Sequence, residues 1–237
     1  MIDIVCVCVG EKYSAKYVQT LQAMVKRHTT KEHRFICFSD RFMLGPDVET
    51  IIIKEKLPGW WNKIAVFNNT YELNERVIMF DLDTVICDNI DWLLEYDGTF
   101  MGIQNLGIVN KYVDKRQYIN VMQSGVLAWD YKLGQQIWDY FKANKDEIMK
   151  RYRGDGEWLN DFIIPDVRDI LQEKYPDQLR SYKYELYDNP ELIKGASIIC
   201  FHGEPSPEQA MTEITYPWGT RHEPFEVREW VAEHWRM

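Results

Sequence analysis

Two aspartates separated by one residue, Asp81 and Asp83, are the residues of this chain best suited to chemistry. They follow the apolar run VIMF, which is typical of a buried strand. Ligands of open α/β sheets bind beyond the carboxyl ends of the strands, so the pair is expected to lie at a ligand site. Two ionised carboxylates on one side of a strand repel each other. A divalent cation, Mn²⁺ or Mg²⁺, held by carboxylates and substrate phosphates would relieve that repulsion and stabilise a departing diphosphate.

Strand and helix patterns alternate around these aspartates. Strands are expected from residues 2, 34, 49 and 77, with helices over residues 14–26 and 61–71. Ser14 is expected to cap the first helix, because its hydroxyl can accept a bond from an amide of the first turn. This βαβ pattern predicts an α/β fold with a Rossmann-like sheet flanked by helices.

The second half of the chain predicts fewer strands and longer helices. Strands are expected over residues 99–104, 121–129 and 197–201. A long helix is expected to end near Arg151, a shorter one to start near Gly156, and a last one to run over residues 224–235. The apolar face of the long helix is expected to contain Leu133, Ile137, Phe141 and Ile148.

Composition narrows the class of protein. The 237 residues are 46% hydrophobic, which suits one large domain spanning residues 1–237. A net charge of −9 argues against a broad basic face for nucleic acid. The five cysteines lie mostly in apolar runs and are expected to be buried thiols. Because we find neither an apolar run of about 20 residues nor a basic leader with a cleavage site, we expect a cytoplasmic protein without a membrane span.

Five segments carry motifs in a recognisable order. They are WNKIAVF (61–67), RVIMFDLDTVICDNIDWLL (76–94), MQSGVLAW (122–129), GDGEWLNDF (154–162) and FHGEPSP (201–207). Together they resemble glycogenin and its relatives, the family 8 glycosyltransferases, over about residues 1–207. The resemblance implies a GT-A fold, with a nucleotide-sugar-binding half in residues 1–104, an acceptor-side half in 105–222 and a C-terminal helix in 223–237.

The resemblance also implies roles for the donor site. The enzyme would transfer a sugar from a uridine diphosphate (UDP) sugar with retention of configuration. Its metal ion would be bound by Asp81, Asp83 and His202, and Asp81 would bind either the metal or the ribose. The uracil would lie near Gly10 and Tyr13, with the Tyr13 ring stacked on the base or packed against the sheet. Gly203 belongs to the late His-Gly segment that contacts the donor.

Three further residues match catalytic positions of the family. Lys63 matches the lysine that reaches the donor sugar, and Asp155 matches the aspartate at a helix start, where a carboxylate also serves as a cap. Gln123 or Asp155 is expected near the anomeric carbon, as a covalent nucleophile or in a front-face displacement.

The chain also departs from the family pattern at three positions. Cys200 stands where the family has its histidine, Gly156 replaces a glutamine, and Ser206 replaces a lysine. Glu157 or Gln123 could compensate for the lost glutamine. The candidates to replace the lysine are Lys194, Arg221 and His222.

The acceptor is not specified by these motifs. A glycan or lipid-linked saccharide is favoured, and a hydroxymethylated DNA base is a second candidate, supported by Lys111, Lys115 and Arg116 but opposed by the overall acidity. Two other classes compete. A phosphatase of the haloacid dehalogenase type also uses an Asp-x-Asp after an apolar strand, although on its first strand. A non-catalytic sugar-binding protein would have little use for Lys63 and Asp155 together.

Overall fold

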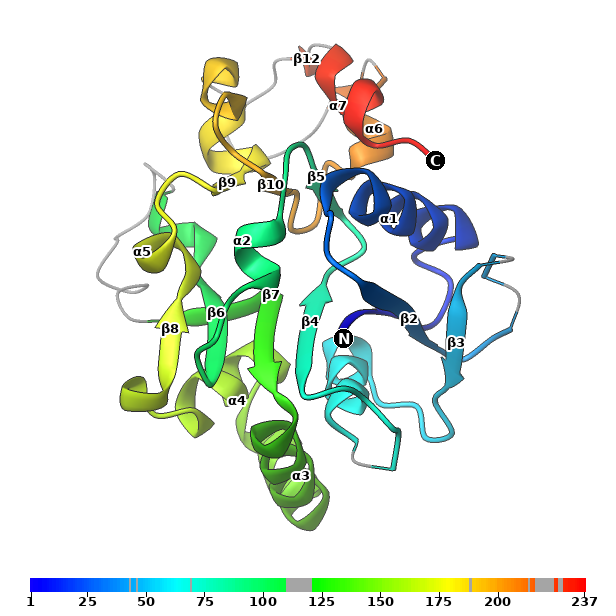
Figure 1. Ribbon diagram of the computed structural model, residues 1–237, viewed down its shortest axis with the longest axis vertical. Helices are drawn as coiled ribbons and strands as arrows, with labels where there is room; N and C mark the ends of the chain where they lie inside the picture. The colour runs from blue at the N-terminus through cyan, green and yellow to red at the C-terminus, as the bar shows by residue number, and fades with distance from the viewer. Residues whose placement is uncertain are drawn as a thin grey trace.

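A mixed seven-stranded sheet with strand order β3-β2-β1-β4-β7-β6-β8 organises the molecule in the computed structural model (Figure 1). Its strands are β1 (Ile2–Cys8), β2 (His33–Ser39), β3 (Glu49–Ile52), β4 (Arg76–Phe80), β6 (Phe100–Gln104), β7 (Met122–Asp130) and β8 (Arg168–Ile170). The structure describes residues 1–42, 44–45, 47–68, 70–109, 121–187, 189–212, 214–215, 224–225 and 228–237. The loop expected around Lys111, Lys115 and Arg116 lies outside these residues.

The direction of the strands explains where a ligand can bind. Strands β1 to β4 run parallel, whereas β7 is antiparallel to both β4 and β6. The chain leaves β1 for β2 on one side and later adds β4 on the other, so the order reverses between β1 and β4. Such a switch point opens a crevice at the carboxyl ends of the strands. Because β7 is antiparallel, its first residues lie at that same edge, where Asp81 N donates to Gly125 O at 2.9 Å.

Helices cover both faces of the sheet. They are α1 (Ala15–His28), α2 (Asp91–Leu94), α3 (Tyr131–Arg151), α4 (Asp155–Phe162), α5 (Leu171–Lys174), α6 (Pro207–Ala210), α7 (Glu229–His234) and the 3₁₀ helices η1 (Gly59–Phe67), η2 (Leu106–Val109), η4 (Pro165–Val167) and η6 (Pro190–Ile193). One core cluster joins α1 to the sheet, and the other joins η1, α3 and α4 to its opposite face. Ile137, Phe141 and Ile148 are buried in α3, as its pattern predicts. In the part of the chain that the structure describes, no helix combines the length and the apolar character needed to cross a bilayer.

A second, three-stranded sheet brings late segments of the chain to the aspartates. It pairs β5 (Thr84–Ile86) with β10 (Ile198–Cys200) and β10 with β9 (Leu179–Ser181). Thr84 and Ser181 are both register partners of Cys200. Asp83, just before β5, and Gly203, after β10, therefore meet at one place, although 120 positions separate them along the chain.

The C-terminal segment closes over α1. Trp235 is buried with its ring 5.1 Å from that of Tyr17, and the guanidinium of Arg27 donates to the carbonyl oxygens of His234 and Arg236. Figure 1 shows α6 and α7, in orange and red, beside α1. A two-residue ladder between β11 (Ile214–Thr215) and β12 (Pro224–Phe225) precedes this segment.

Three local predictions were wrong. Ser14 is at the N-cap of α1 but its side chain makes no capping bond. The helix expected over residues 61–71 is 3₁₀ and ends at Phe67, because Asn68 accepts a bond from the Thr70 amide and starts a turn. The helix expected over residues 224–235 is limited to Glu229–His234, since its first two residues pair as a strand.

The free energy of unfolding depends on a buried aspartate in strand β1. Asp3 is 0% exposed and accepts two bonds of 2.8 Å from Arg34 and two from Asn74. Burial alone would raise the pKa of Asp3, but these bonds outweigh it and lower the pKa below 3.8. Asp3→Ala should reduce the free energy of unfolding by about 3 kcal/mol or more, measured by urea unfolding at pH 7.

The difference should also depend on pH. A carboxylate whose pKa is lowered by folding stabilises the folded state at pH values above its ordinary pKa. This contribution disappears as the pH falls through the lowered pKa. Glu55→Ala, which removes the exposed ion pair with Lys145, is the control and should change the free energy by less than about 1 kcal/mol. Equal effects of the two variants would show that the buried bonds of Asp3 contribute no more than a surface ion pair.

Candidate functional site

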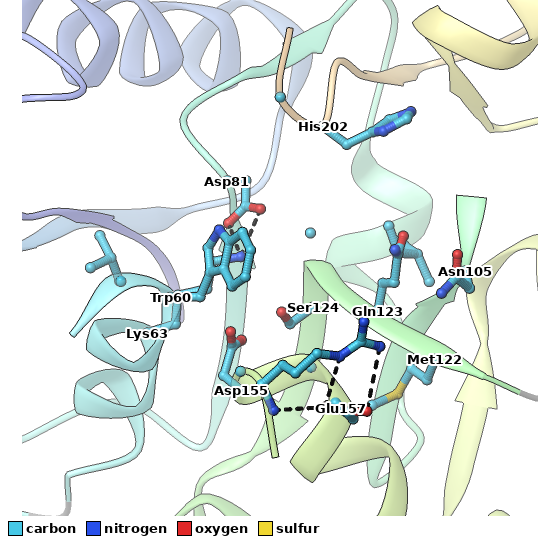
Figure 2. Close-up of a pocket in the computed structure, with 18 of the residues that line it drawn as sticks. Trp60, Lys63, Asp81, Asn105, Met122, Gln123, Ser124, Asp155, Glu157 and His202 are labelled. Carbon is cyan, nitrogen blue, oxygen red and sulfur yellow. Dashed lines mark hydrogen bonds and ion pairs between the residues drawn. The ribbon is translucent and has the colours of Figure 1, made fainter. Parts of the chain in front are cut away.

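A pocket of about 1030 Å³ opens at the edge of the main sheet where β1, β4 and β6 end and β7 begins (Figure 2). Eight of the residues predicted for the site line it: Tyr13, Lys63, Asp81, Asp83, Gln123, Asp155, His202 and Gly203. The structure thus brings together residues from six sequence segments at the place that the sheet order indicates.

Asp81 is held by Lys63. The Lys63 ammonium on η1 lies 2.6 Å from Oδ1 and 2.7 Å from Oδ2 of Asp81, just past the end of β4. Burial raises the pKa of Asp81 to about 7, against the lowering effect of Lys63, and the charge of Asp83 adds to the rise. The pKa of Lys63 is raised because its carboxylate neighbours outweigh the effect of its own burial. Lys63 therefore stays charged, and its ammonium offsets the negative charge of one of the two carboxylates.

Asp83 is held differently and has no lysine partner among its hydrogen bonds in the described residues. It is 6% exposed, and its Oδ2 accepts a bond of 2.9 Å from the Tyr13 hydroxyl and one of 3.2 Å from the Gly203 amide. Gly203 has a φ of 109°, a left-handed conformation that favours glycine and directs this amide to the carboxylate. Burial, with the charge of Asp83, raises the pKa of Tyr13, so its hydroxyl stays a donor at neutral pH.

Asp81 and Asp83 are suited to bind a divalent cation, whereas the ring of the predicted third ligand, His202, is turned away from them. Mg²⁺ and similar ions are commonly bound by one or two carboxylates together with substrate phosphates. Burial and the nearby Lys183 lower the pKa of His202 to about 4, so its ring is neutral as a metal ligand requires. However, His202 Nε2 lies 2.7 Å from Ser181 Oγ, and in Figure 2 the ring extends away from Asp81. Within the described ranges, no three His, Cys, Asp or Glu side chains are grouped to hold a metal ion.

Asp155 has a buried oxygen without a partner. It is 3% exposed at the start of α4, and its Oδ2 makes no hydrogen bond in the structure. It does not cap the helix, contrary to one of its two predicted roles: Gly154 is the N-cap and no side chain caps the amides there. An unpaired buried carboxylate oxygen costs free energy, which a ligand group donating to it would recover. Gln123 is also fixed, since its Oε1 accepts from the Leu106 amide at 3.1 Å.

Gly156 explains one departure from the family pattern. A Cβ at this position would lie 3.2 Å from Ser124 Oγ and 3.5 Å from Ser124 N, because α4 presses on the start of β7. A glutamine there would require Ser124 to shift by a few tenths of an ångström. The close approach brings Asp155 against the residues that precede Gly125.

Other predicted residues lie away from the pocket or outside the described chain. Gly10, with a φ of 74°, donates to Asp40 and is not among the described residues that line the pocket. Lys194 is exposed and does not line it either. Arg221 and His222 lie outside the described residues.

Two residues in or beside the pocket were not predicted from the sequence. Lys183 on the π-helix η5 (Tyr182–Leu186) extends toward Gly203, whose Cβ would lie 3.8 Å from Lys183 Nζ. Trp60 lines the pocket beside Gly154. No sequence signal identified Lys183, since the pairing of β9 with β10 brings it there. Trp60 could have been noticed as the first of two adjacent tryptophans.

Comparisons with known proteins support the fold. No protein-family model matches the chain, and no curated protein matches its sequence. A solved structure of the galactosyltransferase LgtC with donor and acceptor sugar analogues is similar at a TM-score of 0.62 and 13% identity, covering 98% of this chain and 96% of LgtC. The glycosyltransferase GlyE of Streptococcus pneumoniae TIGR4 has a TM-score of 0.64 and 13% identity, and the match covers all of this chain but 61% of GlyE. The bifunctional glycosyltransferase WbbM has a TM-score of 0.61 and 12% identity, with 88% of this chain and 47% of WbbM covered.

At these identities the likeness shows the fold. The chain has the mixed α/β glycosyltransferase fold of the GT-A type, which confirms the fold class expected from its sequence.

The contact between α4 and β7 can be tested without an activity. Gly156→Gln should reduce the free energy of unfolding by about 1–3 kcal/mol, since the longer side chain has to push α4 off Ser124. Chemical denaturation measures this. Glu147→Gln on the exposed face of α3 is the control and should stay within about 0.5 kcal/mol of the wild type. A Gly156→Gln protein as stable as the wild type would show that the two elements are not in close contact.

Proposed function

We propose that this protein is a metal-dependent glycosyltransferase that transfers a sugar from a UDP-sugar to a hydroxyl acceptor with retention of configuration. The observation that carries the proposal is the placement of Asp81 and Asp83 at the carboxyl end of β4, facing Lys63 and Asp155 across one pocket of a glycosyltransferase fold. The likeness to LgtC, whose structure contains donor and acceptor sugar analogues, supports a sugar-nucleotide donor and a saccharide acceptor.

Asp81 and Asp83 would hold a Mn²⁺ or Mg²⁺ ion together with oxygens of the donor diphosphate. His202 would join them once its ring leaves Ser181. The ion, when bound, supplies Lewis-acid stabilisation of the departing diphosphate. Lys63 positions Asp81 and opposes the rise of its pKa, while Tyr13 and the Gly203 amide fix Asp83 by bonds to its Oδ2.

Further residues would orient the donor. Tyr13 lies at the end of the pocket nearest β1, where the uracil is proposed to bind, with Gly10 shaping the preceding turn. We propose that Lys183, beside Gly203, provides the cationic contact to the diphosphate that Ser206 cannot provide. The side chain of Ser206 instead caps α6.

Asp155 and Gln123 are the residues proposed to face the anomeric carbon. The unpaired Oδ2 of Asp155 can accept a bond from a sugar hydroxyl or stabilise positive charge that develops on the sugar ring. Retention of configuration rests on the resemblance to retaining enzymes. Either a covalent step at one of these residues or a front-face displacement satisfies it.

Two other classes of function are less well supported. A phosphatase would use Asp81 as its nucleophile, but both oxygens of Asp81 are bound by Lys63. A non-catalytic sugar-binding protein would have little use for Asp81, Asp83, Lys63 and Asp155 together in one pocket. Phosphate release from phosphomonoesters, stopped by Asp81→Asn, would favour the phosphatase.

The activity can be measured without knowing the acceptor. UDP release from a panel of UDP-sugars in water is expected with Mn²⁺ and should stop with a chelator, because retaining transferases commonly hydrolyse their donor slowly. The sugar whose release is fastest identifies the donor. Absence of UDP release and of donor binding across the whole panel would contradict the proposal.

Asp83 provides a matched pair of variants. Asp83→Asn keeps the shape of the side chain but removes its charge, and UDP release should fall by at least about 100-fold, since metal stabilisation of a leaving group contributes several kcal/mol. Asp88→Asn makes the same change on an exposed residue of the same segment and should leave the rate unchanged. An Asp83→Asn protein with full, chelator-sensitive activity would exclude Asp83 as a metal ligand.

A further inference from the structure

Trp60 is a large aromatic side chain left open at the pocket. It is 65% exposed, yet it lines the same pocket as Lys63, Asp81 and Asp155 (Figure 2). Burying a large apolar side chain is favourable, and ligand pockets are commonly lined by aromatic side chains, so an open indole in this pocket is a candidate binding surface.

The backbone under Trp60 is rigidly anchored. The next residue, Trp61, is 4% exposed and stacks on Phe141 with the ring centroids 5.7 Å apart. Asn62 accepts a bond from the Leu57 amide and donates to the carbonyl oxygens of Leu57 and Gly59. Adjacent tryptophans therefore differ in role: Trp61 fixes η1 in the core, and Trp60 is presented to the pocket.

Gly154 keeps the indole in position. A Cβ on Gly154 would lie 3.2 Å from Trp60 Cε3 and 3.7 Å from Trp60 Cβ. The backbone of Gly154 is extended, with a φ of −171°, and suits any residue. Its missing side chain therefore matters for space alone, because it lets the ring of Trp60 rest against the loop that leads into α4 and Asp155.

The surroundings favour a sugar ring as the occupant of this surface. A pyranose presents an apolar face of C–H groups and a rim of hydroxyls, which matches a flat indole with carboxylates nearby. Asp155 lines the pocket beside Gly154, and its unpaired Oδ2 can accept a bond from such a hydroxyl. Glu157 also lines the pocket and is paired with Arg153, whose guanidinium can donate to a sugar oxygen.

We propose that Trp60 is the platform on which the acceptor saccharide stacks, with Gly154 as its positioning residue. This inference rests on the proposed function and specifies its acceptor as a saccharide. It places the acceptor at the part of the pocket formed by η1 and the start of α4.

The test separates three readouts in the full-length protein. They are the affinity for UDP with Mn²⁺, the slow release of UDP into water, and the KM for methyl glycosides and disaccharides used as acceptors. Trp60→Ala should raise the acceptor KM about tenfold or more, as expected for loss of one stacking contact, and Trp60→Phe should raise it less. UDP affinity and release into water should stay within about twofold. Gly154→Ala, with Trp60 intact, should raise the acceptor KM because the indole is displaced.

Phe42→Ala is the matched control, since Phe42 is 72% exposed and does not line the pocket. It should change none of the three readouts. An unchanged acceptor KM in Trp60→Ala would overturn the inference while the proposed function stands. An equal loss of UDP affinity in Trp60→Ala would also overturn the inference, because it would place the indole against the donor. The inference would fail as well if no glycoside bound or reacted while a hydroxymethylated oligonucleotide was glycosylated. Absence of UDP release in the wild type would instead remove the proposed function itself.

Discussion

The ion pair between Lys63 and Asp81 is the interaction on which the rest of the pocket depends. Two carboxylates, Asp81 and Asp83, stand within one turn of chain at the end of β4, and a single ammonium binds both oxygens of the first. Asp83 relies on the hydrogen bonds from Tyr13 and Gly203. One ammonium therefore stands against two carboxylates at the pocket wall, and a divalent cation bound with a diphosphate would balance the remaining negative charge.

The fold makes this arrangement by converging strand ends. The main sheet brings the end of β4 beside the start of β7, and α4 packs on β7 so closely that a Cβ at position 156 would lie 3.2 Å from Ser124 Oγ. The small sheet joins Asp83, at the start of β5, to the Gly203 segment after β10. Each polar contact of Asp83 thus comes from a segment distant in sequence, and the site could not form from the local Asp-x-Asp turn alone.

The sequence predicted six of the seven strands of the main sheet, because apolar runs are local signals. The residues that its ordered motifs proposed for the site, Asp81, Asp83, Lys63, Asp155 and Gln123, all line one pocket, and their roles stay predictions. It could not predict that His202 pairs with Ser181, since that contact depends on how β9 pairs with β10. It could not distinguish Trp60 from Trp61 either, because successive residues of the 3₁₀ helix η1 point to different sides and only Trp61 faces the core. The C-terminal helix was predicted too long since its start competes with a strand pairing.

Calorimetric titration of UDP with and without Mn²⁺ tests the proposed metal site most directly, because it needs neither the donor sugar nor the acceptor. If Asp81 and Asp83 hold the cation together with the diphosphate, each ligand should bind weakly alone and each should raise the affinity for the other by the same factor, as linkage requires. We expect that factor to be about 100-fold or more. UDP that binds equally tightly in the presence of a chelator would contradict a metal-bridged diphosphate at these two aspartates.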